Sequence, residues 1–401
     1  MIVIDAPKWR MLILCLISLI SVWIAFRPIL RVAKSKNITD CPDHRKLQKV
    51  PIPVLGGAAV FFGIVVGISF FKTMFKYPSI FPIITAMTAL LYVGVIDDVL
   101  SIKPWKRILL EAGAALLVIY GNRYYICDFG GLWGIGEIPL AIGIILSAIT
   151  FVGVVNAINM IDGVDGLCSG FCILVCTAFG LLFFFAYDYS FAALAAVSVG
   201  ALVPFFVHNV VGLKSKMFLG DGGTMVMGTL MASMVFELLS KNFSNNLQLT
   251  TLTTLGVPLD FSLIAFSLAV LSIPIFDTLR VMIERMLRGV SPFSPDKTHL
   301  HHLFTEVGFS YIGTTFRELG LNVLVIASFV LSWLCGAPVD VQLYVVIAVS
   351  LFATLGTATY LRWVKKSHDS FFARRTAAHG RRSHIERKGV WLKIQKMIDE
   401  H

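Results

Sequence analysis

The chain has few charged residues. Asp, Glu, Lys and Arg make up 14% of its 401 residues and hydrophobic residues make up 57%, whereas soluble domains average roughly 25% charged residues. Long runs almost without charge recur from one end to the other. This pattern excludes a water-soluble globular domain and predicts an all-α, polytopic membrane helical bundle. A transmembrane β-barrel would instead show short segments of alternating hydrophobicity.

Features of several other protein classes are also missing. We find no nucleic-acid-binding motif, so the formal net charge of +10 is attributed to membrane topology and anionic lipid head groups. The H-E-x-x-H spacing of a zinc protease is absent. The seven cysteines show no pairing pattern. Cys168, Cys172 and Cys176 recur every four residues in an apolar run, which is typical of small packing residues on one helix face.

The apolar runs predict about eleven transmembrane helices, each near the roughly 20 residues that a bilayer requires. They cover 11–30, 54–71, 80–96, 108–120, 138–157, 167–187, 191–211, 223–239, 261–282, 319–334 and 341–363. The first is interpreted as an uncleaved helix because it lacks a small-residue cleavage site. Pro274 is expected to kink the ninth.

Most Lys and Arg residues fall in the segments that this topology places inside the cell. The bias predicts an external N-terminus, a membrane domain at 1–363 and a basic cytoplasmic tail at 364–401. We interpret the basic tail as a topology determinant near anionic lipid rather than as a specific binding site.

Four polar clusters interrupt the apolar runs, and the topology places all four at inner helix ends. They are Asp97-Asp98, the stretch NAINMIDGVDGL from Asn156 through Asp165, FLGDGGT around Asp221, and SPFSPDKTHLHHLF with His299, His301 and His302. Asp162 and Asp165 are three residues apart, so a helical turn would place them on one side. Several carboxylates, histidines and basic residues at a membrane boundary suit Mg²⁺-assisted phosphoryl chemistry on a lipid.

Each cluster also has an ordinary structural explanation. Asp97-Asp98 could mark a helix end, 156–165 could be an Asx-rich turn, Asp221 could cap a helix, and the histidines could lie in a surface loop. Against this, adjacent carboxylates repel each other unless a cation or base chemistry uses them. Lys103 fits a topology charge and a phosphate contact equally well.

In this order, the four clusters resemble the successive cytoplasmic motifs of the polyprenyl-phosphate N-acetylhexosamine-1-phosphate transferases, over about Asp43 to Phe309. The resemblance implies transfer of a sugar-1-phosphate from a UDP-sugar to a polyprenyl phosphate, with release of UMP and dependence on Mg²⁺ or Mn²⁺. The histidine segment is similar to that of the bacterial inner-membrane group that uses UDP-N-acetylglucosamine and undecaprenyl phosphate. Two departures are Leu300, which separates histidines that are consecutive in the peptidoglycan group, and Thr224, where Ser is frequent.

The resemblance also implies roles for individual residues. Asp221 and Asp98 are expected to bind the metal, and the catalytic set is Asp97, Asp98, Asp162, Asp165 and His301. The substrate-binding set is Asn156, Asn159, His299, His302, Arg280, Arg288 and Lys103.

Several alternatives stay open. The donor could be UDP-GalNAc or UDP-MurNAc-pentapeptide. The displacement could be direct or pass through an aspartyl intermediate, and the protein could be a monomer or a homodimer. A membrane transporter is the alternative from another class, because carboxylates in membrane helices are typical of transporters.

Overall fold

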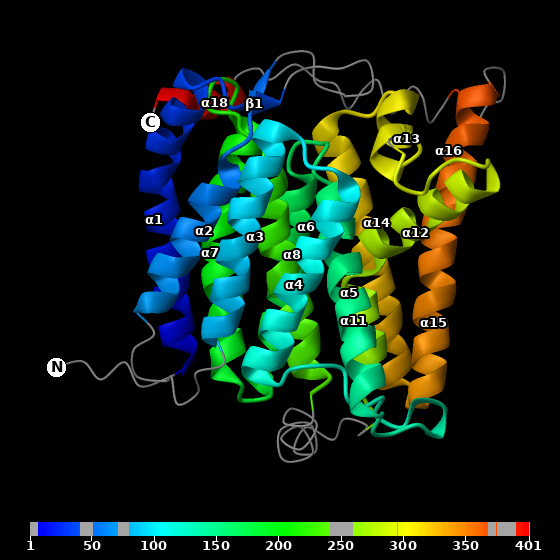
Figure 1. The fold of residues 1–401 in the computed structure, drawn as a ribbon. Helices are drawn as coiled ribbons and strands as arrows, with labels where there is room; N and C mark the ends of the chain where they lie inside the picture. Colours follow the sequence, from blue (N-terminus) through cyan, green and yellow to red (C-terminus); the bar gives the residue numbers. More distant parts are fainter. Residues whose placement is uncertain are drawn as a thin grey trace.

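The computed structural model describes residues 7–40, 51–70, 80–240, 260–294, 296–367, 374 and 390–400. These residues form a bundle of roughly parallel helices, with α1 on one side and α15 on the other (Figure 1). The described strands are β1 (Thr39–Asp40) and β2 (Ile52–Pro53), which pair antiparallel. The predicted all-α membrane bundle is confirmed.

The helices follow the apolar runs closely. In chain order they are α1 (Pro7–Ser35), α2 (Gly56–Ser69), α3 (Ile80–Leu100), α4 (Pro104–Asn122), η1 (Leu132–Gly134), α5 (Leu140–Met160), α6 (Leu167–Phe185), α7 (Tyr189–Val211), α8 (Gly220–Leu238), α11 (Leu263–Val270), α12 (Ser272–Leu287), α13 (Leu300–Val307), α14 (Tyr311–Leu334), α15 (Val339–Leu351), η2 (Phe352–Gly356), α16 (Thr357–Lys366) and α18 (Val390–Glu400).

Seven helices among the described residues are long and apolar enough to cross a membrane, and the bent pair α11–α12 is an eighth candidate. The helix α2 is apolar but has only 14 residues. The predicted number of about eleven therefore stays a prediction. Part of the predicted span 54–71 and most of the basic tail lie outside the described residues.

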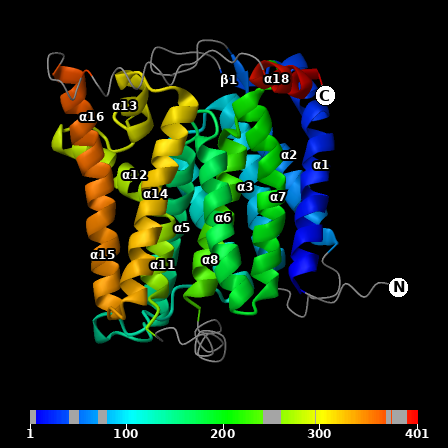
Figure 2. The ribbon, with the colours of Figure 1, turned by 180° about the vertical axis from the view of Figure 1, so that it is seen from behind.

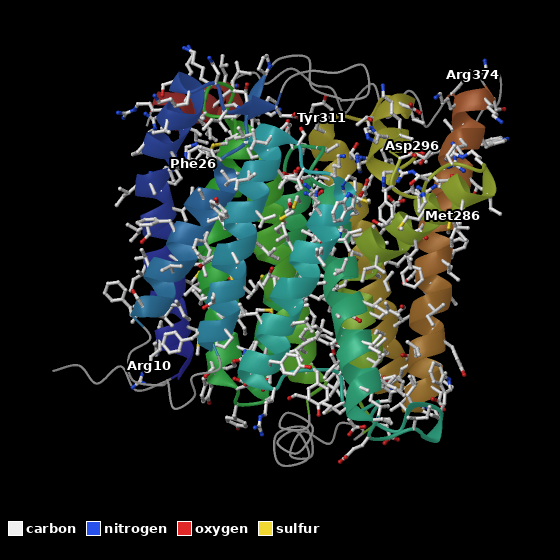
Figure 3. The ribbon with its side chains drawn as sticks, viewed as in Figure 1. Arg10, Phe26, Met286, Asp296, Tyr311 and Arg374 are labelled. Atoms are coloured by element: carbon white, nitrogen blue, oxygen red, sulfur yellow. The ribbon has the colours of Figure 1, made fainter. Side chains whose placement is uncertain are left out.

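The bundle has two distinct ends. The start of α1 lies at one end, whereas β1, α13, α16 and α18 lie at the other (Figures 1 and 2). Figure 3 places Asp296 and Tyr311 at the second end and Arg10 at the first. We call the second end the inner end, following the charge bias of the sequence; the orientation in the cell stays a prediction.

The helix α8 runs through the interior and packs against α2, α3 and α5. Glycines let the backbones meet directly. A Cβ atom on Gly57 would lie 2.2 Å from the Cα of Gly223, and one on Gly94 would lie 2.4 Å from the Cα of Gly222. Small residues permit such close helix contacts in membranes. These four glycines, here called the glycine seam, fix α8 against α2 and α3 just below the inner end.

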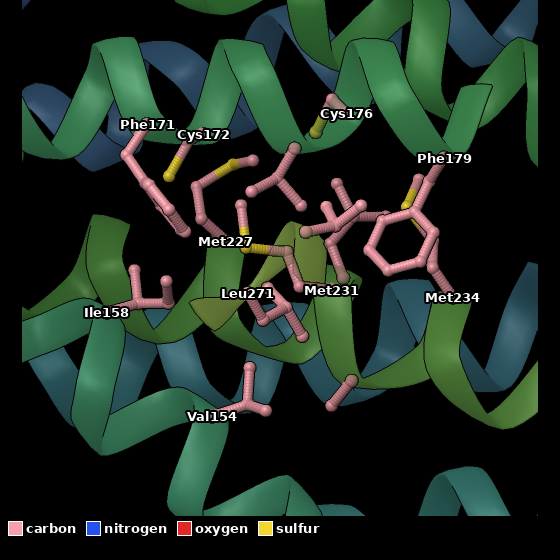
Figure 4. Close-up of a cluster of buried hydrophobic side chains, with 14 of the residues drawn as sticks. Val154, Ile158, Phe171, Cys172, Cys176, Phe179, Met227, Met231, Met234 and Leu271 are labelled. Atoms are coloured by element: carbon pink, nitrogen blue, oxygen red, sulfur yellow. The ribbon is translucent and has the colours of Figure 1, made fainter. Parts of the chain in front are cut away.

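The cysteines of α6 pack in the interior as predicted. Cys168, Cys172 and Cys176 are buried and form no disulfide. Figure 4 shows Cys172 and Cys176 on the face of α6 that points toward Met227 and Met231 of α8. Soft, polarisable sulfur side chains fill irregular gaps well, so this cluster is part of the core.

The chain bends by 74° between α11 and α12. The break lies at Leu271, three residues before Pro274. A proline in a helix has no N–H for the carbonyl four residues earlier, which here belongs to Val270, and its ring crowds that carbonyl. Asn322 of α14 satisfies the freed groups: its Nδ2 donates to the Val270 carbonyl at 2.9 Å, and its Oδ1 accepts from the Ile273 N–H at 3.0 Å. The predicted kink is confirmed.

Replacing Asn322 by Leu should destabilise the bundle strongly. Asn322 is fully buried, and each backbone group left without a partner costs about 1–3 kcal/mol. We expect a lower midpoint of thermal unfolding in detergent. The control is Ser328→Ala, because within the described residues the Ser328 hydroxyl donates to the Val325 carbonyl of its own helix. Equal midpoints for the two variants would contradict the role of Asn322.

Candidate active site

Carboxylates of α3 and α8 meet at the inner end. Asp97 and Asp98 lie in the last turn of α3, and Asp221 is the second residue of α8, whose N-cap is Leu219. Asp221 is therefore not a helix cap, which was one alternative. Its backbone N–H donates to Oδ1 of Asp98 at 3.2 Å. Oδ2 of Asp98 is buried and has no hydrogen-bond partner within the described part of the chain. A buried carboxylate oxygen needs a proton, a donor or a cation.

Arg107 of α4 supplies positive charge to this group. Its Nε donates to the buried Glu111 at 2.9 Å, and one terminal nitrogen lies 3.4 Å from Oδ2 of Asp97 and 3.9 Å from Oδ2 of Asp221. The other oxygen of Asp97 accepts from the Ile102 N–H at 2.6 Å, which closes the turn between α3 and α4. Arg107 thus faces two carboxylates on two other helices.

Asn156 and Asn159 bring α5 into the same network. The side-chain amide of Asn159 donates to Oδ1 of Asp221 and, at 2.8 Å, to the hydroxyl of Thr224. The amide of Asn156 donates to Glu111. Both asparagines therefore orient acidic side chains in this structure, and their predicted contacts with substrate stay predictions.

Asp162 and Asp165 lie in the non-helical turn between α5 and α6. The expectation that a helical turn places them together is wrong, because the chain leaves α5 at Met160. Oδ2 of Asp162 accepts from the Gly220 N–H at 3.0 Å, whereas Oδ2 of Asp165 accepts from Nζ of Lys216 at 2.7 Å. Burial raises the pKa of Asp162 to about 7. A carboxyl group with such a pKa can exchange a proton near neutral pH.

The histidine segment lies beside the turn between α5 and α6. His299 precedes α13, and the ring of His301 stacks with it at 5.7 Å between centroids and contacts His302 at 4.4 Å. A Cβ atom on Gly163 would lie 3.3 Å from Nε2 of His301, so this ring faces the turn that carries Asp162. The second and fourth polar clusters of the sequence are therefore neighbours in space.

His301 and His302 are neutral near physiological pH. Burial, together with the neighbouring histidines, lowers the pKa of His301 well below its usual value. Burial also lowers the pKa of His302 to about 4. A neutral imidazole offers one N–H donor and one acceptor. These rings are thus suited to hydrogen bonding rather than to charge pairing with phosphate.

Arg280 of α12 and Arg288, the C-cap residue of this helix, contact the segment that leads to the histidines. Arg280 is 5% exposed and donates to Asp277 at 2.7 Å and to the Thr298 carbonyl at 2.6 Å. Asp277 in turn lies 2.8 Å from Nδ1 of His299. Arg288 is half exposed and donates to Asp296 at 3.2 Å. The structure gives both arginines contacts within the chain, and their predicted substrate contacts stay predictions.

Sequence reasoning missed several members of this network. Glu111 and Asp277 are carboxylates within apolar runs, a signal that points to function. Lys216 gave no signal beyond its place on the inner side. The structure puts Arg107 among the carboxylates, whereas Lys103 is an exposed N-cap residue of α4.

Taken together, these contacts gather acidic, amide and imidazole side chains from six helices at one end of a membrane bundle. Such a site is typical of an integral membrane enzyme that acts on phosphate-bearing substrates. Among the described residues, no three His, Cys, Asp or Glu side chains form a preformed metal-binding set.

Sequence comparison with known proteins indicates which kind of membrane enzyme this chain resembles. Residues 80–239 match the model of glycosyl transferase family 4. The undecaprenyl-phosphate alpha-N-acetylglucosaminyl 1-phosphate transferase of Escherichia coli (strain K12) is 28% identical over 70% of this chain and 72% of that protein. The Salmonella typhi protein of the same name is 29% identical over the same shares. The decaprenyl-phosphate N-acetylglucosaminephosphotransferase of Mycobacterium tuberculosis is 28% identical over 76% of this chain and 78% of that protein.

The resemblance seen in the four polar clusters is thereby confirmed. The chain is similar to the polyprenyl-phosphate hexosamine-1-phosphate transferases, a placement that the family match and the relatives support. It is a multi-pass membrane protein and an enzyme of the glycosyl-1-phosphate transferase kind.

Proposed function

We propose that the protein transfers N-acetylglucosamine-1-phosphate from UDP-GlcNAc to undecaprenyl phosphate in the bacterial inner membrane. The products would be UMP and undecaprenyl-diphospho-GlcNAc, the first lipid-linked intermediate of a cell-envelope polysaccharide. An oxygen of the lipid phosphate forms a bond to the phosphorus that carries the sugar. The bond from that phosphorus to the bridging oxygen of UMP breaks, and UMP leaves.

The observation that supports this proposal best is the meeting of Asp98 and Asp221 at the inner end. Oδ2 of Asp98 is buried without a hydrogen-bond partner in the described chain, and the other oxygen accepts from the backbone N–H of Asp221 on the neighbouring helix α8. This pair fits Mg²⁺, which commonly binds one or two carboxylates and completes its shell with water and substrate phosphates. Bound there, Mg²⁺ would neutralise phosphate charge.

The chain's own residues would divide the remaining work. Asp162, with a pKa near 7, can accept the proton of a lipid phosphate that is still protonated, since the second pKa of a phosphate monoester is about 6. His301 would donate a hydrogen bond to the diphosphate. Asn159 keeps Asp221 in place through its amide.

Two alternatives to this function follow from the sequence. UDP-GalNAc and UDP-MurNAc-pentapeptide would use the same chemistry with another donor. A transporter would need its charged groups at the middle of the membrane, whereas the Asp97, Asp98 and Asp221 side chains lie in the last turn of α3 and the first turn of α8. We therefore favour the transferase.

The deciding assay uses the purified full-length protein with undecaprenyl phosphate, Mg²⁺ and labelled UDP-GlcNAc. We expect release of UMP and a labelled lipid, with loss of both when EDTA is added and recovery with excess Mg²⁺. Activity with another UDP-HexNAc alone would correct the sugar. Inactivity with every nucleotide sugar would reject the transferase, and activity unaffected by EDTA would reject the metal.

A further inference from the structure

The carboxyl-terminal helix α18 lies across the inner end of α7, beside α1 (Figures 1 and 2). One side of this helix is buried there, with Ile398 4% and Gln395 8% exposed. Arg27 of α1 donates to the carbonyl of Ile398 at 3.4 Å. The end of the chain is therefore docked on the bundle, next to the loop 212–219 that joins α7 to α8.

Asp399 of α18 binds the backbone of this loop. Its Oδ1 accepts from the N–H groups of Leu213 at 3.1 Å, Lys214 at 2.9 Å and Ser215 at 3.0 Å, and from the Ser215 hydroxyl at 3.0 Å. Successive backbone N–H groups that converge in this way form an anion-binding nest. Burial opposes the charge of Asp399, but hydrogen bonds from Ser215 and its neighbours lower the pKa of this carboxyl group. The contact is thus charge-assisted and replaces water on several backbone donors.

The same loop leads directly into the candidate active site. The residue after Ser215 is Lys216, whose Nζ lies 2.7 Å from Asp165. The carbonyl of Met217 accepts from the side-chain amide of Asn209 at 2.8 Å. The first residue of α8 after the loop is Gly220, whose N–H donates to Asp162 at 3.0 Å. A shift at 213–215 would therefore reach the partners of Asp165 and Asp162 within a few residues.

We propose that Asp399 is a positioning residue for this site and acts through the loop. By holding 213–215, the carboxyl-terminal helix keeps Lys216 against Asp165 and keeps the start of α8, which carries Asp221, in register with Asp98. The effect on turnover rests on the proposed function. The effect on the loop itself does not.

The first test compares amide hydrogen–deuterium exchange in the full-length protein and in Asp399→Ala. Because a charged acceptor is lost, exchange at 213–215 should become faster by about tenfold or more. Exchange at 217–222 should also rise, since the proposal couples the two segments. Asp399→Asn keeps one acceptor oxygen and should restore most of the protection. Lys396→Ala, an exposed change on the same helix, is the control.

The second test measures transfer by the same variants. Misplacing catalytic groups by about 1 Å costs on the order of a hundredfold in rate, and a partly loosened loop should lower kcat about tenfold with a smaller change in KM for the lipid. Faster exchange confined to 213–215 with unchanged kcat would overturn the positioning role. Unchanged exchange at 213–215 would overturn the contact itself. An inactive wild-type protein would reject the proposed function alone, because the exchange result is obtained without turnover.

Discussion

Asp221→Asn is expected to reduce sugar-phosphate transfer by at least about a hundredfold, the usual effect of removing one preorganised electrostatic group from an active site. The substitution keeps the size of the side chain and an oxygen toward Asn159. It removes the negative charge that faces Arg107 at 3.9 Å and that we assign to Mg²⁺. The loss should therefore appear in turnover and not in folding.

The measurement is UMP release by purified protein at saturating UDP-GlcNAc and Mg²⁺. Membrane yield and the thermal midpoint in detergent should match the wild type. Asp128→Asn is the matched control, because this carboxylate lies in the loop between α4 and α5 at the other end of the bundle and accepts a local hydrogen bond from the Gly130 N–H. Normal turnover by Asp221→Asn would reject the metal assignment.

His301→Ala is expected to lower kcat by about a hundredfold, a magnitude typical of losing one oriented donor or acid–base group. His301 is 3% exposed, is neutral near pH 7 and faces Gly163. Its contribution is then a hydrogen bond rather than a charge. His301→Gln, which keeps an uncharged N–H donor, should retain more activity than His301→Ala.

Transfer kinetics of the two His301 variants decide between these roles. The thermal midpoints should be compared as well, because Ala leaves a cavity beside His299 and His302. If both variants keep the wild-type transfer rate, His301 has no role in transfer, and the histidine segment is a structural loop. A rate that Gln fails to recover would show that the ring is needed for more than its N–H group.

Much of this arrangement could be predicted from the sequence because the physics is local. Apolar runs require helices in a membrane, and Pro274 disrupts the helix four residues after Val270. The polar clusters around Asp98 and Asp221 had to lie at helix ends, where water reaches carboxylates. The charge bias placed these ends on the same side of the membrane, and the hydrogen bond between Asp98 and Asp221 now shows that they meet.

Other features depend on packing between distant segments, which spacing does not encode. The sequence around Asn322 does not indicate that its amide bonds the backbone groups freed at the helix break before Pro274. Likewise, the sequence around Lys216 does not indicate that this residue pairs with Asp165. Asp399 resembled an ordinary charge in a basic tail. The catalytic and substrate roles assigned to the site residues stay predictions until the variants are assayed.

The glycine seam has a consequence for how this protein can change over time. Gly57 and Gly94 lie against Gly223 and Gly222, directly beside Asp221. A single methyl group there would push α8 away from its neighbours and carry the carboxylate with it. Exposed apolar positions such as Phe81 can change to other apolar residues at little cost. The glycines of the seam cannot be replaced in this way, so selection for a stable fold and selection for a fast reaction act on the same four residues. Attempts to stabilise the protein by replacing glycine with alanine should avoid them.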